Sequence, residues 1–386
     1  MDAVIIGGGL IGLSTAWRLA QQGRRVAVWD AGRLGAEASW AGAGMLAPGG
    51  ELEQRSWWGD LAVQSLLAYP EFVRELAEEA GSRIDYRACG ALQIAATDRE
   101  WEQVRARAGK QLKWGIRSEE AGGRKLFYPD DAAVDPRDLL RALRTACERR
   151  GVEFREAQKV QEIVVASGRV VQPEQAEVAV LAAGAWSSAI PICVEGEQIA
   201  VEKSFPVRGH LIAFAAGIEA PGPILRQGHT YILERSNGVA IAGSTTERVG
   251  YLREPDPAQL DDIEGRARDL MPGLSGRPRT DTWIGFRPGT ASGEPQLRGV
   301  ADAPVYLAYG HYRNGILMAP ATAEWIARAI SASSQTDSTL HSAHPESGRE
   351  RAGSAEEAAP TRAPDPPLRP PSTAGEFRER PDRSLE

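Results

Sequence analysis

The 386-residue sequence contains little cysteine and no long hydrophobic run. Cys89, Cys147 and Cys193 are too few for a disulfide framework and form no CxxC pair for a metal. Unpaired cysteines are typical of a reducing compartment, so we expect the protein in the cytoplasm. No apolar run approaches the roughly 18 to 20 residues of a membrane span, and an acid and a glycine loop stand where a signal peptide has basic residues. These absences predict an intracellular protein that does not span a membrane.

The sequence also lacks an excess of basic charge, with 45 Lys and Arg residues against 52 Asp and Glu residues and a net charge of -7. The basic residues occur at most in short clusters such as Arg149-Arg150. A nucleic-acid surface needs a strongly basic stripe to hold the phosphate backbone. We therefore do not expect nucleic acid as a partner.

The C-terminal segment, residues 331–386, has few of the large apolar side chains that build a core. It contains eight of the 25 prolines, and its larger apolar residues are Leu340, Leu368, Phe377 and Leu385. Such a segment cannot bury enough surface to offset its ordering entropy. We expect a disordered tail whose partner, if it has one, the sequence does not identify. The preceding 330 residues suffice for two domains.

The N-terminus has the pattern of a dinucleotide-binding unit. The apolar run Ala3–Ile6 predicts a buried strand, and it leads into Gly7, Gly9 and Gly12 of a GxGxxG turn and then a helical pattern. The glycines permit a tight turn, close approach of backbone to a pyrophosphate, and packing of helix on strand. Asp30, 18 residues after Gly12 at the end of the next strand, can accept the ribose hydroxyls. The motif does not distinguish FAD from NAD.

The strand and helix patterns predict an α/β fold. We expect a Rossmann-type domain assembled from separated segments, to which the segment Ala38–Pro48 discussed next assigns FAD, and a substrate domain with a mixed, largely antiparallel sheet. Strands are expected at Val160–Val165, Val178–Leu181 and Val305–Tyr309, and a last helix from near Pro320. The expected boundaries are 1–78, 138–197 and 284–330 for the FAD-binding domain, 79–137 and 198–283 for the substrate domain, and 331–386 for the tail.

The choice of FAD depends on the segment Ala38–Pro48, with the sequence ASWAGAGMLAP. Small residues let the backbone pass close to a flat ring, and Ser39 can bind a phosphate; alone, the segment is equally compatible with a flexible loop. Its position resembles the flavin-contacting segment of the D-amino-acid oxidase superfamily. Its residues are most similar to the glycine oxidases of thiamine biosynthesis.

Further segments extend this resemblance over about residues 1–330. They are His229–Tyr231, Gly243–Glu247, Gly285–Thr290 and Gly310–Pro320. The resemblance implies a two-domain flavoenzyme that oxidises glycine, or a small amine such as sarcosine, to an imine and glyoxylate with hydrogen peroxide, feeding thiazole synthesis. It also implies a homotetramer. Residues 287–318 lack the cysteine that binds flavin covalently in sarcosine-oxidase relatives, so we expect noncovalent FAD.

The same resemblance assigns substrate binding to Arg287, with Tyr231 as a second contact and Arg313 near the flavin. An arginine presents a planar fork that grips a carboxylate by two parallel hydrogen bonds. The alternative for Arg287 is a structural ion pair, and for Tyr231 an ordinary half-buried strand aromatic. We assign no catalytic role to His229 or His311, and no metal site.

The predicted cofactor-binding residues lie mostly at strand ends and in loops. Gly315, Ile316 and Leu317 would turn backbone amides toward the flavin, and Val160 would bind through its backbone. The full set is Gly7, Gly9, Leu10, Ile11, Gly12, Asp30, Ala31, Ser39, Ala43, Gly44, Met45, Val160, Gly184, Trp186, Arg287, Arg313, Asn314, Gly315, Ile316 and Leu317.

Two other functions remain open. Within the enzymes, a D-amino-acid or sarcosine-type oxidase or dehydrogenase has the same motifs, because the pocket volume depends on side chains that the sequence does not place. Outside the enzymes, the chain would be a non-catalytic nucleotide-binding module that uses its tail for partner binding. The sequence does not identify the electron acceptor.

Overall fold

The computed structural model describes residues 1–215, 217 and 221–341, with side-chain exposure described as far as Ser333. Residues 1–337 form one compact unit. Its first sheet has six strands in the order β20-β21-β12-β1-β2-β9, all parallel except the edge strand β20. The strands are β1 (Ala3–Ile6), β2 (Val26–Trp29), β9 (Glu153–Arg155), β12 (Val178–Leu181), β20 (Gln296–Gly299) and β21 (Val305–Tyr309).

Both faces of this sheet are covered, which explains why its central strands are apolar throughout. Ile5 and Val28 face helices, whereas Val4 and Ala27 face a second, four-stranded sheet. The helices are α1 (Leu10–Gln21), α3 (Trp57–Ala80), α5 (Pro136–Arg149) and α7 (Gly315–His341). The smaller sheet has the order β11-β10-β13-β14, with β10 (Ile163–Ala166), β11 (Arg169–Gln172), β13 (Ile192–Val194) and β14 (Glu197–Ile199).

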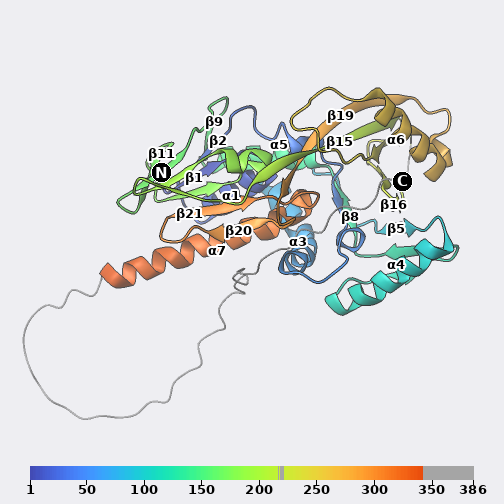
Figure 1. The fold of residues 1–386 in the computed structure, drawn as a ribbon, viewed down its shortest axis with the longest axis horizontal. Coiled ribbons are helices and arrows are strands. Elements are labelled where there is room, and N and C mark those ends of the chain that lie inside the picture. Colours follow the sequence, from blue (N-terminus) through green and yellow to red (C-terminus); the bar gives the residue numbers. More distant parts are fainter. Residues whose placement is uncertain (216, 218–220, 342–386) are drawn as a thin grey trace, which may run out of the picture. The chain divides into compact units, whose positions relative to one another are not determined.

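An eight-stranded sheet forms the other half of the unit, and Figure 1 shows its strands beside β8 and α4 and away from β1 and β2. Its order is β19-β15-β18-β17-β16-β5-β7-β6, antiparallel except for the parallel pair β16 and β5. The predicted mixed, largely antiparallel sheet is thus confirmed. The strands are β5 (Ala91–Ile94), β6 (Glu119–Glu120), β7 (Lys125–Tyr128), β15 (Ser204–Ala215), β16 (Ile224–Gln227), β17 (Thr230–Glu234), β18 (Val239–Gly243) and β19 (Arg279–Thr290).

The two faces of this large sheet have different partners. One face packs on α6 (Pro257–Leu270), and the other contacts the alanine-rich segment after β2. α4 (Asp98–Gln111) packs near β7. The short elements are α2 (Ala38–Ala41), β3 (Met45–Leu46), β4 (Tyr86–Arg87), β8 (Ala132–Val134), η1 (Pro48–Gly50), η2 (Leu112–Trp114), η3 (Gly184–Ala189) and η4 (Pro272–Leu274).

The last helix is longer at both ends than the sequence predicts. It begins at Gly315 rather than near Pro320. Proline has no N–H for the carbonyl of Ile316 four residues earlier, and the Tyr69 hydroxyl donates to that carbonyl instead at 3.0 Å. The helix therefore continues through Pro320 without an unsatisfied carbonyl at Ile316.

The C-terminal end of α7 also differs from the expected boundary, because the helix continues through Ser331 to His341. The Ser333 hydroxyl bonds to the Tyr306 hydroxyl at 2.8 Å and to the Ala329 carbonyl at 3.1 Å. These contacts hold a polar helical extension that apolar content alone does not predict.

Residues 342–386 of the expected tail lie outside the described residues. Across the described part of the chain, no helix has the length and apolarity to cross a bilayer.

Candidate active site

The glycine turn between β1 and α1 brings backbone close to backbone. Gly7 has φ +109°, which favours glycine, and an added Cβ there would collide with the carbonyl of Ala182, just after β12. An added Cβ at Gly12 would collide with the carbonyl of Gly7. The N-cap, Gly9, has no capping side chain. The first amides of α1 have no partner within the helix, and apart from the Leu10 amide, which donates to Ser39, they remain suited to an anion.

Two side chains complete this nucleotide end. The Ser39 hydroxyl accepts a hydrogen bond from the Leu10 amide at 2.9 Å. Asp30 Oδ2 accepts from the Gly8 amide and Oδ1 from the Gly32 amide, both at 2.8 Å. Each carboxylate oxygen keeps a further acceptor position, so backbone contacts orient Asp30 without exhausting its capacity to bind hydroxyls.

One large cavity, with a volume of about 390 Å³, runs from this turn to the eight-stranded sheet. It brings together nearly all the predicted site residues, from five distant parts of the sequence. Gly12 and Leu317 are absent from its wall: the first packs against Gly7, and the second is in the core. The predicted residues on the wall are Gly7, Gly9, Leu10, Ile11, Asp30, Ala31, Ser39, Ala43, Gly44, Met45, Val160, Gly184, Trp186, Tyr231, Arg287, Arg313, Asn314, Gly315 and Ile316.

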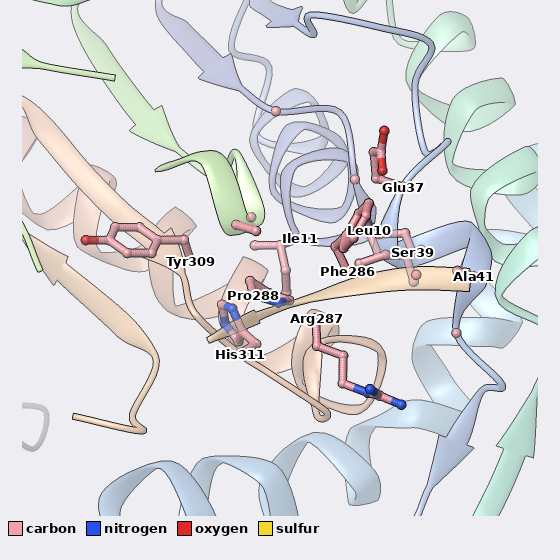
Figure 2. Close-up of a pocket in the computed structure, with 18 of the residues that line it drawn as sticks. Leu10, Ile11, Glu37, Ser39, Ala41, Phe286, Arg287, Pro288, Tyr309 and His311 are labelled. Atoms are coloured by element: carbon pink, nitrogen blue, oxygen red, sulfur yellow. Dashed lines mark hydrogen bonds between the residues drawn. The ribbon is translucent and has the colours of Figure 1, made fainter. Parts of the chain in front are cut away.

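Arg287 extends from β19 away from Leu10, Ile11 and Ser39, as Figure 2 shows. Its Nη1 donates to the Thr245 carbonyl at 3.0 Å and its Nη2 to the Ser244 hydroxyl at 2.7 Å. Among the described residues it has no acidic partner, so the structural ion pair considered from the sequence is not present. Burial lowers the pKa of Arg287, and the nearby Arg313 contributes. An anion placed beside this guanidinium would relieve both effects.

A hydrogen-bond network holds the acceptor of Arg287 in place. The Thr245 hydroxyl donates to Glu247 at 3.1 Å and accepts from the His210 amide at 3.0 Å. Glu247 also pairs with Arg208 at 3.0 Å. Because Thr245 is fixed from its side chain, its carbonyl offers Arg287 a rigid contact.

Arg313 differs from Arg287 in having an acid beside it. Its Nε donates to Glu51 at 2.9 Å, and both residues line the cavity. Burial opposes the charge of Arg313, but Glu51 and Tyr231 outweigh burial and raise its pKa. The positive charge of Arg313 is thus compensated by Glu51, whereas no acid compensates that of Arg287 among the described residues.

Tyr231 lies on the face of the sheet that lines the cavity. It pairs in register with Gly243 on β18, and a Cβ at Gly243 would lie 2.7 Å from the tyrosine hydroxyl. Tyr231 is 6% exposed, and its electrostatic effect raises the pKa of both Arg287 and Arg313. The hydroxyl is therefore near both guanidinium groups.

The two loop histidines remain without a catalytic assignment. His311 lies on the cavity wall, but its Nε2 bonds to the Thr322 hydroxyl at 3.0 Å, and burial lowers its pKa to about 4. His229 is exposed on the turn between β16 and β17. His311 is thus a neutral, hydrogen-bonded structural residue.

Comparison with known proteins extends this geometry. A family described as FAD dependent oxidoreductase matches residues 2–329. The chain belongs to this family. It is 35% identical over 353 residues to the bifunctional protein ThiO/ThiG of Synechocystis sp., a match covering 85% of this chain and 51% of that protein. It is 30% identical over 347 residues to the glycine oxidase of Bacillus licheniformis, covering 85% and 92%.

The fold of this FAD-dependent oxidoreductase is also found in solved structures. The crystal structure of glycine oxidase from Geobacillus kaustophilus superimposes with a TM-score of 0.80 at 27% identity, covering 86% of this chain and 94% of that one. The chain spans about half the length of the bifunctional relative and nearly all of the glycine oxidases it matches.

The cavity of this FAD-dependent oxidoreductase fits FAD at the positions that the structure itself constrains. Amides of α1 and the Asp30 carboxylate suit a pyrophosphate and a ribose. Added Cβ atoms at Gly42 and Gly44 would collide with Ile316 and with the Val134 carbonyl, so larger residues could not keep this segment against the wall. The start of α7 lies against this segment at Ile316, and the first amides of that helix have no carbonyl partner within it.

Sequence reasoning missed several residues at the end of the cavity that is bounded by the eight-stranded sheet. Glu51 and Arg226 line the wall, and Gly209 on β15 makes room for Arg287, because an added Cβ there would overlap the guanidinium. A glycine inside a strand pattern signals a close approach, so Gly209 was detectable in principle. Glu51 and Arg226 carry no such signal, since charged residues are common in loops and at strand ends.

Proposed function

We propose that this chain catalyses the FAD-dependent oxidation of glycine and similar small amines, with O₂ as the acceptor. One glycine, one O₂ and one water would give one glyoxylate, one ammonium ion and one hydrogen peroxide. Two-electron oxidation of the C–N bond gives an imine, which water hydrolyses. The two electrons finally reduce O₂ to hydrogen peroxide. The observation that carries the proposal is Arg287, a partly buried guanidinium that donates hydrogen bonds only to neutral groups and lines the same cavity as the dinucleotide turn. The names of the relatives agree with it.

The chain's own residues would act by binding and orientation. Arg287 would hold the substrate carboxylate by two N–H groups, and the Tyr231 hydroxyl would donate to it. The apolar wall would exclude water from the amine and its adjacent carbon. FAD, when bound, supplies the two-electron acceptor. Holding the reactants in line contributes several kcal/mol without a general base.

The remaining features of the proposal come from the resemblance. We propose noncovalent FAD, because no cysteine is among the cavity-lining residues in the described part of the chain. We also propose a homotetramer, a cytoplasmic location and delivery of the product to thiazole synthesis. Light scattering of the purified protein tests the tetramer, and flavin release on acid precipitation tests the mode of attachment.

A spectrum and a substrate panel test the activity. The purified protein should be yellow, and anaerobic glycine should bleach its visible absorbance. In air, glycine should release peroxide and glyoxylate in equal amounts. Peroxide from sarcosine or D-alanine with none from glycine would favour the D-amino-acid or sarcosine-type oxidase instead. A yellow protein that is inert to every amine would favour a non-catalytic module.

A further inference from the structure

Arg226 is a buried guanidinium that the proposed reaction on glycine does not use. It lies on β16, is 6% exposed and lines the cavity. Its Nε, Nη1 and Nη2 have no hydrogen-bond partner among the described residues. A buried arginine normally satisfies its five donors, so this one requires an explanation.

The acid beside Arg226 does not satisfy it. Asp131 Oδ2 lies 3.1 Å from Nη1, but the two groups are not aligned for a hydrogen bond, and Oδ2 also lacks a partner among the described residues. Burial raises the pKa of Asp131 to about 7, although Arg226 opposes the shift. Asp131 therefore compensates the charge of Arg226 at one nitrogen, whereas Nε and Nη2 have neither a hydrogen bond nor an ion pair among the described residues.

The surroundings of Arg226 hold its guanidinium in place at the cavity wall. Its guanidinium lies 5.0 Å from the centroid of the Tyr128 ring. On its other side the backbone of Gly50 passes so closely that an added Cβ would overlap Nη1. Gln111 fixes this loop by donating to the Gly49 carbonyl at 2.9 Å and the Leu52 carbonyl at 2.6 Å.

The register of the sheet places Arg226 on the same face as the substrate anchor. Arg226 is directly opposite Tyr231, and Tyr231 is directly opposite Gly243. Arg287 reaches Ser244 and Thr245, just beyond Gly243. The Arg287 guanidinium reaches from β19 to the end of β18, and Arg226 is on β16, so the two residues flank Tyr231 of β17. β18 and β16 are two strand spacings, or about 10 Å, apart. A small amine with a carboxylate at each end bridges a gap on the order of 10 Å once its hydrogen bonds are included.

We propose that Arg226 forms a second carboxylate-binding subsite, which makes small amines with two carboxylates substrates of this chain. The inference rests on the proposed function for the reaction itself. With N-carboxymethylglycine, one substrate, one O₂ and one water would give one glyoxylate, one glycine and one hydrogen peroxide. The nitrogen stays with the glycine product, and the oxidised carbon leaves as glyoxylate.

Binding of unreactive acids tests the subsite without turnover. Glutarate and butyrate differ by one carboxylate, and calorimetry on the FAD-loaded protein should give glutarate an affinity at least about tenfold higher. The double variant R226Q/D131N, which conserves net charge, should remove this difference. Gly50→Ala, which displaces the guanidinium and keeps its charge, should reduce it. Arg266→Gln is the matched control, because Arg266 contacts Thr230 at 2.7 Å from α6, on the opposite face of the sheet.

Turnover then separates the two proposals. The ratio of kcat/KM for N-carboxymethylglycine over N-methylglycine, and for D-aspartate over D-alanine, should fall about tenfold or more in R226Q/D131N. Equal affinity of glutarate and butyrate for the unmodified protein would overturn the subsite. So would a preference for glutarate that persists in both R226Q/D131N and Gly50→Ala. Absence of turnover with every amine, together with a glutarate preference that depends on Arg226, would reject the oxidase and retain the subsite.

Discussion

The two ends of the cavity are built differently. At the nucleotide end, backbone groups make the contacts: glycines permit close approach, and the Asp30 carboxylate is oriented by two amides. At the opposite end, side chains make them, and Arg287, Arg313, Arg226 and Tyr231 all line the cavity there. A backbone-built site tolerates many side chains but few changes of shape. A site built from charges depends on the identity of each group.

Arg287→Ala tests the charge-built end most directly. Loss of two charge-assisted hydrogen bonds to the substrate carboxylate should lower kcat/KM for glycine by about a thousandfold. FAD content, read from the ratio of visible to ultraviolet absorbance, should not change. Arg279→Ala is the control, since Arg279 is on the same strand but pairs with Asp261 at 3.1 Å, remote from the cavity wall. Glycine turnover that survives Arg287→Ala would remove the substrate anchor.

Gly12→Ala tests the backbone-built end. The added methyl group would collide with the Gly7 carbonyl, so α1 could no longer pack on the turn. We expect a protein that purifies with less than about a tenth of its FAD, through a binding loss of several kcal/mol. Gly109→Ala on α4 is the control, because an added Cβ there meets no atom within 4 Å and should stabilise the helix by up to about 1 kcal/mol. Full FAD content in Gly12→Ala would contradict the close packing.

The same contrast explains what the sequence predicted and what it did not. The nucleotide end depends on spacings within 30 residues, so Gly7, Gly9, Gly12 and Asp30 are legible from the sequence alone. Arg287 was identified through a resemblance, and its freedom from an ion pair appears only in the structure. Glu51 and its partner are 262 residues apart, a separation that no local pattern bridges. Side-chain pairing across distant strands is a tertiary property.

Helix boundaries show the same limit. Pro320 predicts a helix start, because proline is favoured in the first turn. In the structure the helix begins at Gly315, and the Tyr69 hydroxyl from α3 donates to the Ile316 carbonyl, which has no N–H partner at Pro320. Only the packing of α3 on α7 reveals this substitute donor.

The predicted domain boundaries remain predictions, since residues 1–337 form one compact unit.

His311→Gln tests the wall where β21 leads into α7. Burial lowers the pKa of His311 from 6.5 to about 4, so the folded protein resists protonation that the unfolded chain accepts. Its contribution to stability is complete above pH 6.5 and is lost as pH falls toward 4, by about 2 to 3 kcal/mol at pH 4.5. Urea midpoints at pH 7 and 4.5 should therefore differ less in His311→Gln than in the unmodified protein. His229→Gln, on an exposed turn, should leave the difference unchanged; equal differences in all three proteins would reject a buried neutral His311.

Gly209→Ala gives the smallest expected effect and joins the two kinds of construction, because a glycine here serves a charged side chain. Its added methyl group would overlap the Arg287 guanidinium, which can shift because it is the end of a flexible side chain. We expect KM for glycine to rise about tenfold with kcat reduced less, since binding geometry changes while the charge remains. Gly265→Ala on α6, where an added Cβ meets no atom within 4 Å, should leave both constants unchanged. If KM in Gly209→Ala equals that of the unmodified enzyme, the position of the Arg287 fork does not set glycine affinity, and the substrate end tolerates displacement as the nucleotide end does not.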